Sequence, residues 1–221
     1  MRYDARHKAK TRDRLLKEAT KAIRSKGPHR IGVAEVMDRV GLTHGGFYAH
    51  FKSKDELVTA AVGQALAEAR ARIEVDTQDR SATEGVTAVI DRYLSAAHRD
   101  ARTHGCALTF LSTDIPRLPR ASRERFAAGV ANLVEDLAGH LGRLGRADPE
   151  AEASSMLAEL CGALSLARAE PDGRRSSAFL ARSRSALKRR LGLEAAQIQT
   201  KRKQPCPAPP RAHRSQARSL S

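Results

Sequence analysis

Apolar side chains recur every three or four residues along most of the chain, which is the spacing that puts them on one face of an α-helix. Near the N-terminus the pattern predicts a helix over about residues 11–26, which Gly27 and Pro28 end. A shorter helix follows, with one apolar face made of Val33, Val36, Met37 and Val40. We expect residues 1–10, which are polar and basic, to be frayed.

The same helical spacing continues beyond residue 52, and no two-residue alternation typical of strands interrupts it. Ser53 to Glu56 and Ser81 to Glu84 have the spacing of capping boxes, and Asp148 before Pro149 is a further start signal. The fold is therefore expected to be all-α. The expected helices cover residues 53–75, 122–145, 149–169 and 175–191, and a further helix carries Val86 to Ala97. A short element is expected over residues 105–113.

A sharp turn separates the second helix from a third one. Gly41 can end the second helix, because glycine adopts the left-handed conformation at little steric cost. Thr43 can cap the next helix, which runs from His44 to Phe51. Helix, glycine turn and helix form the helix-turn-helix arrangement, whose second helix lies in the major groove of DNA.

The stretch GLTHGGFYAHFKSKDEL, from Gly41 to Leu57, resembles the tetracycline-repressor (TetR) family of bacterial transcription regulators. The likeness is strong over residues 8–60, and beyond them it covers only the all-helical plan. One residue departs from the usual helix-turn-helix pattern: Met37 stands four residues before the turn glycine, where alanine is usual. A larger side chain there widens the helix contact unless the flexible thioether folds aside.

The resemblance implies an N-terminal three-helix head with the helix-turn-helix, linked by a helix to an all-helical C-terminal domain for ligand binding and dimerisation. We expect the DNA-binding domain over residues 8–54, with the motif at 32–51, and the second domain over residues 55–194. Residues 195–221 are basic, rich in proline and without apolar periodicity, and are expected to be a disordered tail.

The DNA-contacting residues are expected on and around the third helix. Its N-terminal end, where bases are usually contacted, holds Thr43, His44 and Gly45. A pair of glycines in so short a helix favours close approach to DNA over a loose surface turn. Tyr48 is similar to the family tyrosine that meets a phosphate. The candidate DNA-binding residues are Arg30, Thr43, His44, Gly45, Gly46, Tyr48, His50 and Lys54.

The distribution of charge agrees with a nucleic-acid partner. The chain of 221 residues carries a formal net charge of +15. Residues 1–58 have a net charge of +7, residues 59–170 of −3 and residues 171–221 of +11. A basic head and tail on a slightly acidic body suit a protein that binds a polyanion with one end and something else with its middle.

Two further sites are expected in the body. The helices at 149–169 and 175–191 have wide stripes of small and apolar residues, and in the resembling family such a pair forms a four-helix bundle with a second copy. The interpretation that they close the monomer core stays open. A ligand pocket, which we expect to be aliphatic, would be lined by Tyr93, Leu94, Ala97, Cys106, Leu108, Phe110, Leu111, Phe126 and Val130.

The cysteines are odd in number and far apart, so they predict neither a disulfide framework nor a zinc site. Cys106 is either a small buried residue or a thiol that senses oxidants. His98, Asp100 and His104 do not have the spacing of a metal or catalytic site, and we expect neither a cofactor nor enzyme activity. No run of apolar residues is long enough to span a membrane, and the N-terminus lacks a signal peptide, which indicates a cytoplasmic protein.

The sequence thus predicts a cytoplasmic DNA-binding transcription regulator, in particular a repressor. It would bind a palindromic double-stranded DNA operator as a homodimer and be released by a small hydrophobic ligand. The alternative is an architectural protein that binds nucleic acid through charge, without choice of sequence.

Overall fold

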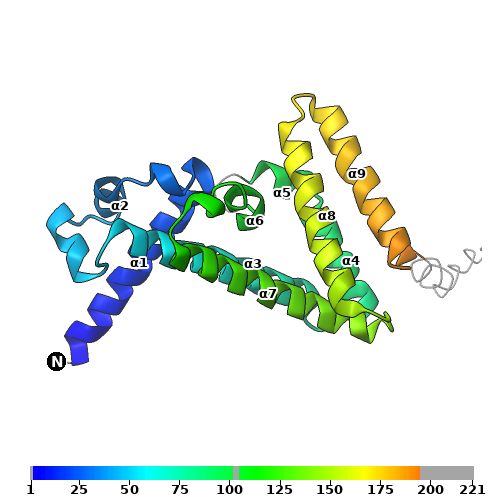
Figure 1. Ribbon diagram of the computed structural model, residues 1–221, viewed down its shortest axis with the longest axis horizontal. Helices are drawn as coiled ribbons and strands as arrows, with labels where there is room; N and C mark the ends of the chain where they lie inside the picture. The colour runs from blue at the N-terminus through cyan, green and yellow to red at the C-terminus, as the bar shows by residue number, and fades with distance from the viewer. Residues whose placement is uncertain (1, 102–104, 195–221) are drawn as a thin grey trace, which may run out of the picture.

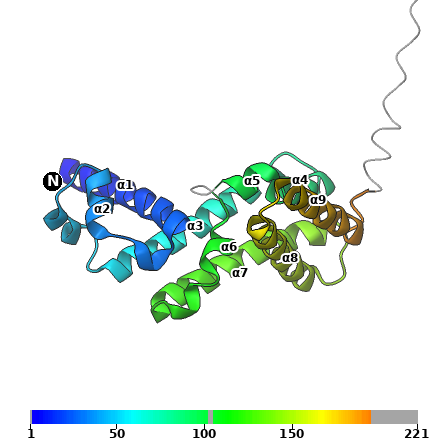
Figure 2. The same ribbon diagram turned by 90° about the horizontal axis from the view of Figure 1, so that it is seen from above.

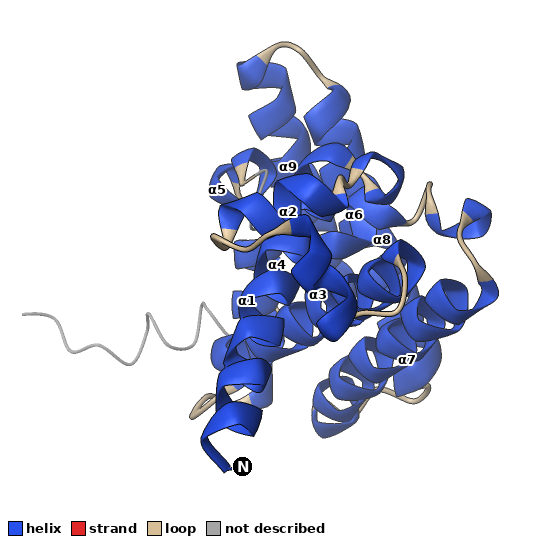
Figure 3. Ribbon diagram, turned by 90° about the vertical axis from the view of Figure 1, so that its left-hand side faces the viewer, coloured by secondary structure: helices blue, strands red, loops and turns tan. Residues whose placement is uncertain are grey.

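The computed structural model describes residues 2–101 and 105–194 of the chain. Within these ranges all regular elements are helices and no strand occurs, so the all-α prediction is confirmed (Figure 3). The N-terminal helices form one end of the molecule, two long helices run along its length, and the last two helices form the other end (Figure 1). The tail predicted to be disordered, with Cys206, lies outside the described residues, as does His104.

The head contains four helical elements. They are α1 (Arg2–Lys26), the 3₁₀ helix η1 (Pro28–Arg30), α2 (Val33–Arg39) and the 3₁₀ helix η2 (His44–Ala49). The start of α1 differs from the expectation, because the helix extends through residues 2–10 instead of beginning near residue 11. This stretch is rich in alanine, lysine and arginine, which are strong helix formers and sustain a helix without apolar periodicity.

The rest of the described chain forms the body. Its elements are α3 (Lys54–Thr77), α4 (Ala82–Tyr93), α5 (Ala96–Asp100), α6 (Ala107–Leu111), the 3₁₀ helix η3 (Ile115–Arg117), α7 (Arg120–Arg143), α8 (Pro149–Ala169) and α9 (Gly173–Arg190). The expected long helices are all present. The helix expected to continue from Val86 to Ala97 instead ends at Tyr93, because the Ser95 hydroxyl accepts a bond from the His98 N–H at 3.1 Å and starts α5.

The predicted helix starts are capped as expected, with one exception. Ser81 and Glu84 form a complete capping box at the start of α4, and Asp148 accepts a bond from the Ala151 N–H at the start of α8. At α3 only half of the box forms. Ser53 accepts from the Glu56 N–H at 3.1 Å, but the Glu56 carboxylate turns to the N–H of Lys52 at 2.7 Å.

Helices α3 and α7 lie side by side and form the most extensive helix contact of the molecule (Figures 1 and 2). They approach closely at Gly129, where an added Cβ would lie 2.4 Å from Leu66 Cδ1. The leucines beneath this contact are fully buried, among them Leu133 and Leu137 at 1% exposure. Burial of each leucine contributes roughly 1.5–3 kcal/mol. The contact between α3 and α7 is therefore a main source of the body's stability.

The head is joined to the body by a partly buried ion pair and by α6. The Arg24 side chain, 3% exposed, binds Glu68 at 2.6 Å and the Ala65 carbonyl at 3.3 Å, which fastens α1 to α3. Helix α6 packs against α1, α3 and α8 together. A movement in the body can therefore reach the head along α3 and through α6. In the described part of the chain, no helix is apolar enough over a sufficient length to span a membrane.

His98 is a buried histidine between α4 and α8. Its Nδ1–H donates to the Tyr93 carbonyl at 2.9 Å, and its ring lies edge-on to the Tyr93 ring at 4.8 Å. Burial lowers the pKa of His98 to about 4, and the neighbouring charges of Arg92, Arg168 and Arg72 act in the same direction. The imidazole is therefore neutral in the folded protein at pH 7.

Acidification should destabilise the protein through His98. The folded pKa lies below the ordinary value of 6.5, so the unfolded chain binds more protons and stability falls as the pH falls from 6.5 towards 4. By pH 5 the loss is about 2 kcal/mol. Urea unfolding at pH 7 and pH 5 measures this loss in the free energy of unfolding. In His98→Asn the loss between the two pH values should be smaller by about 2 kcal/mol. His29→Asn, at an exposed histidine, is the control. An equal reduction of the pH dependence in both variants would contradict its assignment to His98.

Candidate nucleic-acid interface

The turn between α2 and η2 is built on Gly41. Its φ is +73°, in the left-handed region, and its N–H donates to the Asp38 carbonyl at 2.9 Å. The Leu42 N–H donates to the Met37 carbonyl at 3.0 Å, which completes a Schellman motif. The prediction that Gly41 ends the second helix is thus confirmed.

The element after the turn is a 3₁₀ helix instead of the expected helix capped by Thr43. The Thr43 side chain accepts no capping bond, and the Gly46 N–H instead bonds the Thr43 carbonyl at 3.0 Å, three residues back. Gly45 and Gly46 explain the tighter winding, because glycine gives the least support to a regular α-helix. The segment is still a short helical element, or rod.

One side of this rod is buried in the head. Phe47 and Phe51 are 2% and 1% exposed, and their rings stack with centroids 5.8 Å apart. Met37 is also buried, and its Cε lies 3.5 Å from the position that a Cβ of Gly46 would occupy. The large residue at position 37 is accommodated because its flexible end lies against a glycine.

The other side of the rod faces solvent. Thr43, His44 and Gly45 are exposed, and a Cβ added at Gly45 would meet no atom within 4 Å. Tyr48 is 67% exposed and touches Phe47 edge-on, with ring centroids 5.4 Å apart. These four candidates therefore lie together on one exposed surface, and the protein's own packing does not require glycine at position 45.

Two basic candidates flank the rod. The Lys54 ammonium donates to the His29 carbonyl at 3.1 Å, which holds the start of α3 against η1. Arg30, also in η1, is exposed. An ammonium has three N–H donors, so Lys54 keeps donors for a further partner. Gly46 and His50, by contrast, are half-buried.

A basic group on α1 was missed by sequence reasoning. Burial and the nearby charges of Lys8, Arg12 and His7 lower the pKa of His50, so these side chains lie close to the end of the rod. Arg12 also covers the Phe51 ring, with its guanidinium carbon 4.6 Å from the centroid. The signal in the sequence was the four-residue spacing of Lys8 and Arg12, which places both on one face of a helix.

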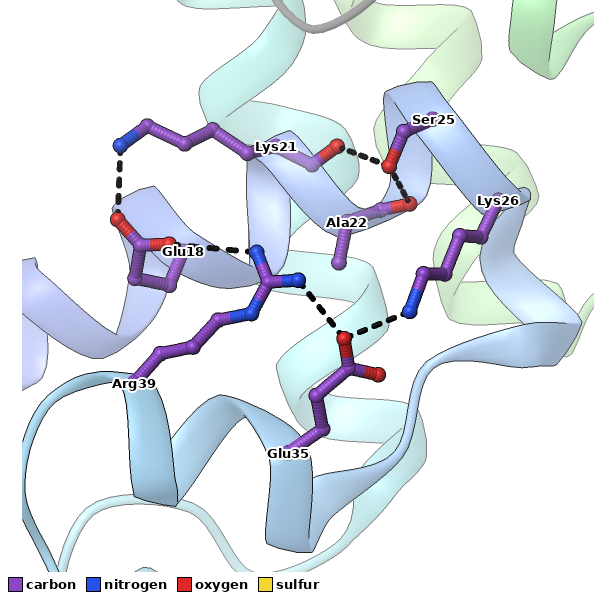
Figure 4. A network of polar contacts seen from close by, with 7 residues as sticks. All are labelled: Glu18, Lys21, Ala22, Ser25, Lys26, Glu35 and Arg39. Carbon is purple, nitrogen blue, oxygen red and sulfur yellow. Dashed lines mark hydrogen bonds and ion pairs between the residues drawn. The ribbon is translucent and has the colours of Figure 1, made fainter.

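A surface network holds α2 against α1 (Figure 4). Arg39 and Lys26 both bind the Glu35 carboxylate, at 2.8 and 2.6 Å, and Arg39 also lies 3.8 Å from Glu18. The hydrogen bond from Lys26 and the charge of Arg39 hold the pKa of Glu35 below its usual value. These exposed pairs add orientation more than stability.

The nine residues expected to line a ligand pocket are not brought together. Three of them, Tyr93, Cys106 and Leu108, line a cavity of about 30 Å³ beside α3. Leu94 and Leu111 are core residues, and Ala97 is exposed. Phe110 contacts the Arg168 guanidinium at 4.3 Å, whereas Phe126 and Val130 line a separate open hollow between α7 and the start of α8.

The lining of the cavity is more basic than the aliphatic pocket that the sequence favoured. Arg24, Arg72, Arg92 and His98 line it beside leucine and isoleucine side chains. Apolar periodicity identifies the faces that helices bury against one another, and it does not register long cationic side chains that reach inward from the edges of those faces.

Comparison with known proteins gives the family. The sequence of residues 15–61 matches the family model of bacterial regulatory proteins of the tetR family. These residues include the turn at Gly41 and the whole of η2. The N-terminal head, over residues 15–61, is that of a TetR-family protein. The matched region covers most of the head and the start of α3, and it supports a DNA-binding transcription regulator.

Solved structures share the fold over nearly their whole length. A TetR-family transcriptional regulator from Agrobacterium tumefaciens is 28% identical, with a TM-score of 0.70, and covers 82% of this chain and 98% of its own. Reduced E. coli NemR is 21% identical, with a TM-score of 0.71, and the match covers 81% of this chain and 96% of NemR. No curated protein sequence matches the chain.

Replacing Gly41 by alanine should destabilise the head by roughly 1–2 kcal/mol, because the residue must keep a left-handed conformation. Gly45→Ala is the matched control, since its φ is not positive and its surroundings are open. Chemical unfolding of the two variants measures the difference. Equal stability of both would show that the turn does not depend on Gly41.

Proposed function

We propose that this TetR-family protein is a dimeric repressor that binds a palindromic operator and is released by a small ligand. The observation that supports it most is the division of η2 into a buried aromatic side and an exposed polar side. A short helix with one side packed in the head and the other side exposed suits entry into the major groove.

The exposed side suggests a distinct role for each residue. Thr43 and His44 stand at the start of the rod and can reach base edges, while Gly45 leaves the surface bare for close approach of the DNA. Tyr48, Lys54 and Arg30 would contact phosphates, as would the basic group of α1 at Lys8 and Arg12. Phosphate contacts would fix the position of the rod and base contacts would select the sequence.

The outer surface of α8 and α9 supports dimerisation. The exposed residues of α8 are mostly small, and Leu166 is 60% exposed among them. Small residues let two helices approach closely, as in a four-helix bundle formed with a second copy. This exposed set is Ala151, Ser155, Ala158, Gly162, Ser165, Leu166 and Ala169, and Ala178 and Ala186 of α9 are also exposed.

A dimer with two-fold symmetry would determine the symmetry of the operator and the spacing of its half-sites. Two rods related by a two-fold axis present the same surface to two DNA half-sites, about 34–36 Å apart or near a multiple of that distance. The half-sites must then be inverted repeats. An architectural protein that binds through charge alone would need no such symmetry.

The ligand would act on the link between body and head. A hydrophobic molecule that enlarges the cavity at Tyr93 and Leu108 must displace Leu133 or Leu157, which also line it. Both α3 and α6 border this region and contact α1. The ligand releases DNA only if it binds better to the arrangement in which the heads are wrongly spaced.

The phosphate and base roles should separate in DNA-binding titrations. Lys54→Ala and Tyr48→Phe should weaken binding to all sequences, and Lys54→Ala should reduce the salt slope by about one. His44→Ala should instead change the preference between operators by roughly 1–3 kcal/mol. Fluorescence anisotropy at several salt concentrations, on matched and mismatched operators, measures both effects. An unchanged slope for Lys54→Ala would remove it from the phosphate contacts.

The dimer surface can be tested at Gly162, where an added side chain meets no atom of the same chain within 4 Å. Gly162→Glu should therefore leave the monomer folded and separate the dimer, because two carboxylates would be forced into a close helix contact. Gly142→Glu on α7, equally open within the chain, is the matched control. Sedimentation should give monomer for the first and dimer for the second. A dimeric Gly162→Glu variant would place the interface elsewhere.

A further inference from the structure

Two cysteines and a tyrosine meet inside the body. The Tyr93 hydroxyl lies 2.7 Å from Cys106 Sγ and 3.1 Å from Cys161 Sγ. The three residues come from the end of α4, the start of α6 and the middle of α8. Tyr93 and Cys106 are 7% and 4% exposed. A single hydroxyl thus bridges two thiols that are 55 positions apart in the sequence.

The surroundings make the two thiols unequal. Burial raises the pKa of Cys106, but hydrogen bonds from the Cys161 thiol, the Tyr93 hydroxyl and the backbone at Thr109 and Leu108 outweigh it and bring the pKa to about 6. The same contact and burial raise the pKa of Cys161. The contact thus favours the thiolate at Cys106 over Cys161, which is the division of roles that a nucleophile and a resolving thiol need.

A small cavity leads to Cys106. It has a volume of about 30 Å³ and is bordered by Gly105, Arg72 and His98 as well as by Cys106 itself. A space of this size holds a molecule as small as water, so it suits hydrogen peroxide. It is far too small for a bulky oxidant such as glutathione disulfide.

From this geometry we propose that Cys106 and Cys161 form a reversible disulfide on reaction with hydrogen peroxide. The Cys106 thiolate attacks one peroxide oxygen, the O–O bond breaks, and the departing hydroxide takes a proton and leaves as water. Cys161 then attacks the sulfur of the Cys106 sulfenic acid and releases the second water. Two thiols are oxidised and one peroxide is reduced, with two waters formed.

The disulfide would change how the body supports the head. It replaces the bridge through Tyr93 by a covalent bond between α8 and the residue that precedes α6. Because α6 also packs on α1 and α3, a shift of α6 is transmitted to the head. We expect oxidation to weaken operator binding at least about fivefold, the lower end of allosteric couplings. This consequence rests on the proposed function, whereas the disulfide does not.

The chemistry is tested by mass spectrometry on the full chain carrying Cys206→Ser, so that only these two cysteines remain. Peroxide should remove two hydrogen atoms from the protein and join the peptides of Cys106 and Cys161, and dithiothreitol should reverse both changes. Adding Cys161→Ser should stop the reaction at a sulfenic acid on Cys106. Adding Cys106→Ser should slow oxidation at least about tenfold, because the remaining thiol is protonated.

Other results would overturn the proposal. The disulfide is refuted if Cys106 remains reduced, or if the two cysteines are oxidised separately while both are present. Equal rates with peroxide and with glutathione disulfide would refute access through the cavity. Tyr93→Phe keeps the ring and removes the shared hydroxyl, so it should slow the first step about tenfold. An unchanged rate would remove the tyrosine from the mechanism.

Operator titration of the reduced and oxidised protein tests the regulatory consequence. If the disulfide forms and the affinity stays the same, the coupling through α6 is refuted and the oxidation site stands. If the reduced protein selects no operator, the proposed function fails, and the mass measurement still decides the chemistry.

Discussion

The burial of two phenylalanines behind η2 is the constraint on which the head depends. With Phe47 and Phe51 held in the core of the head, Thr43, His44, Gly45 and Tyr48 are left exposed on the other side. The glycine turn fixes where this segment begins, and Met37 fills the space that Gly46 leaves. The exposed surface is therefore not a loose loop. It is the exposed side of an element whose other side is packed in the head, so its shape is fixed.

Side-chain contacts also fix the head against the body. Arg24 reaches from α1 to Glu68 and to the backbone of α3, in a setting that excludes water from the guanidinium. Removing one partner of such a pair costs much more than an exposed pair would. Helix α3 then continues into its long contact with α7. The head is therefore held by the same helix that carries the main contact of the body.

The sequence predicted the helices and the turn well because local rules govern them. Gly41, the capping serine at position 81 and the proline at 149 each act on the residues beside them, and the structure has them in those roles. The 3₁₀ winding of η2 was not predicted, because the two glycines were interpreted as part of a regular α-helix capped by Thr43, whereas that side chain makes no capping bond. The meeting of Cys106 with Cys161 was also hidden, because contacts between distant segments leave no periodic signal.

The central claim is that the exposed side of η2 reads DNA from two copies of the chain at once. Selecting DNA from a random pool with the full-length protein, and sequencing what is bound at physiological salt, tests it most directly. The account predicts one enriched inverted repeat, with half-sites about one helical turn apart or a near multiple. Bound fragments without any shared sequence, or with a single unrepeated half-site, would contradict it.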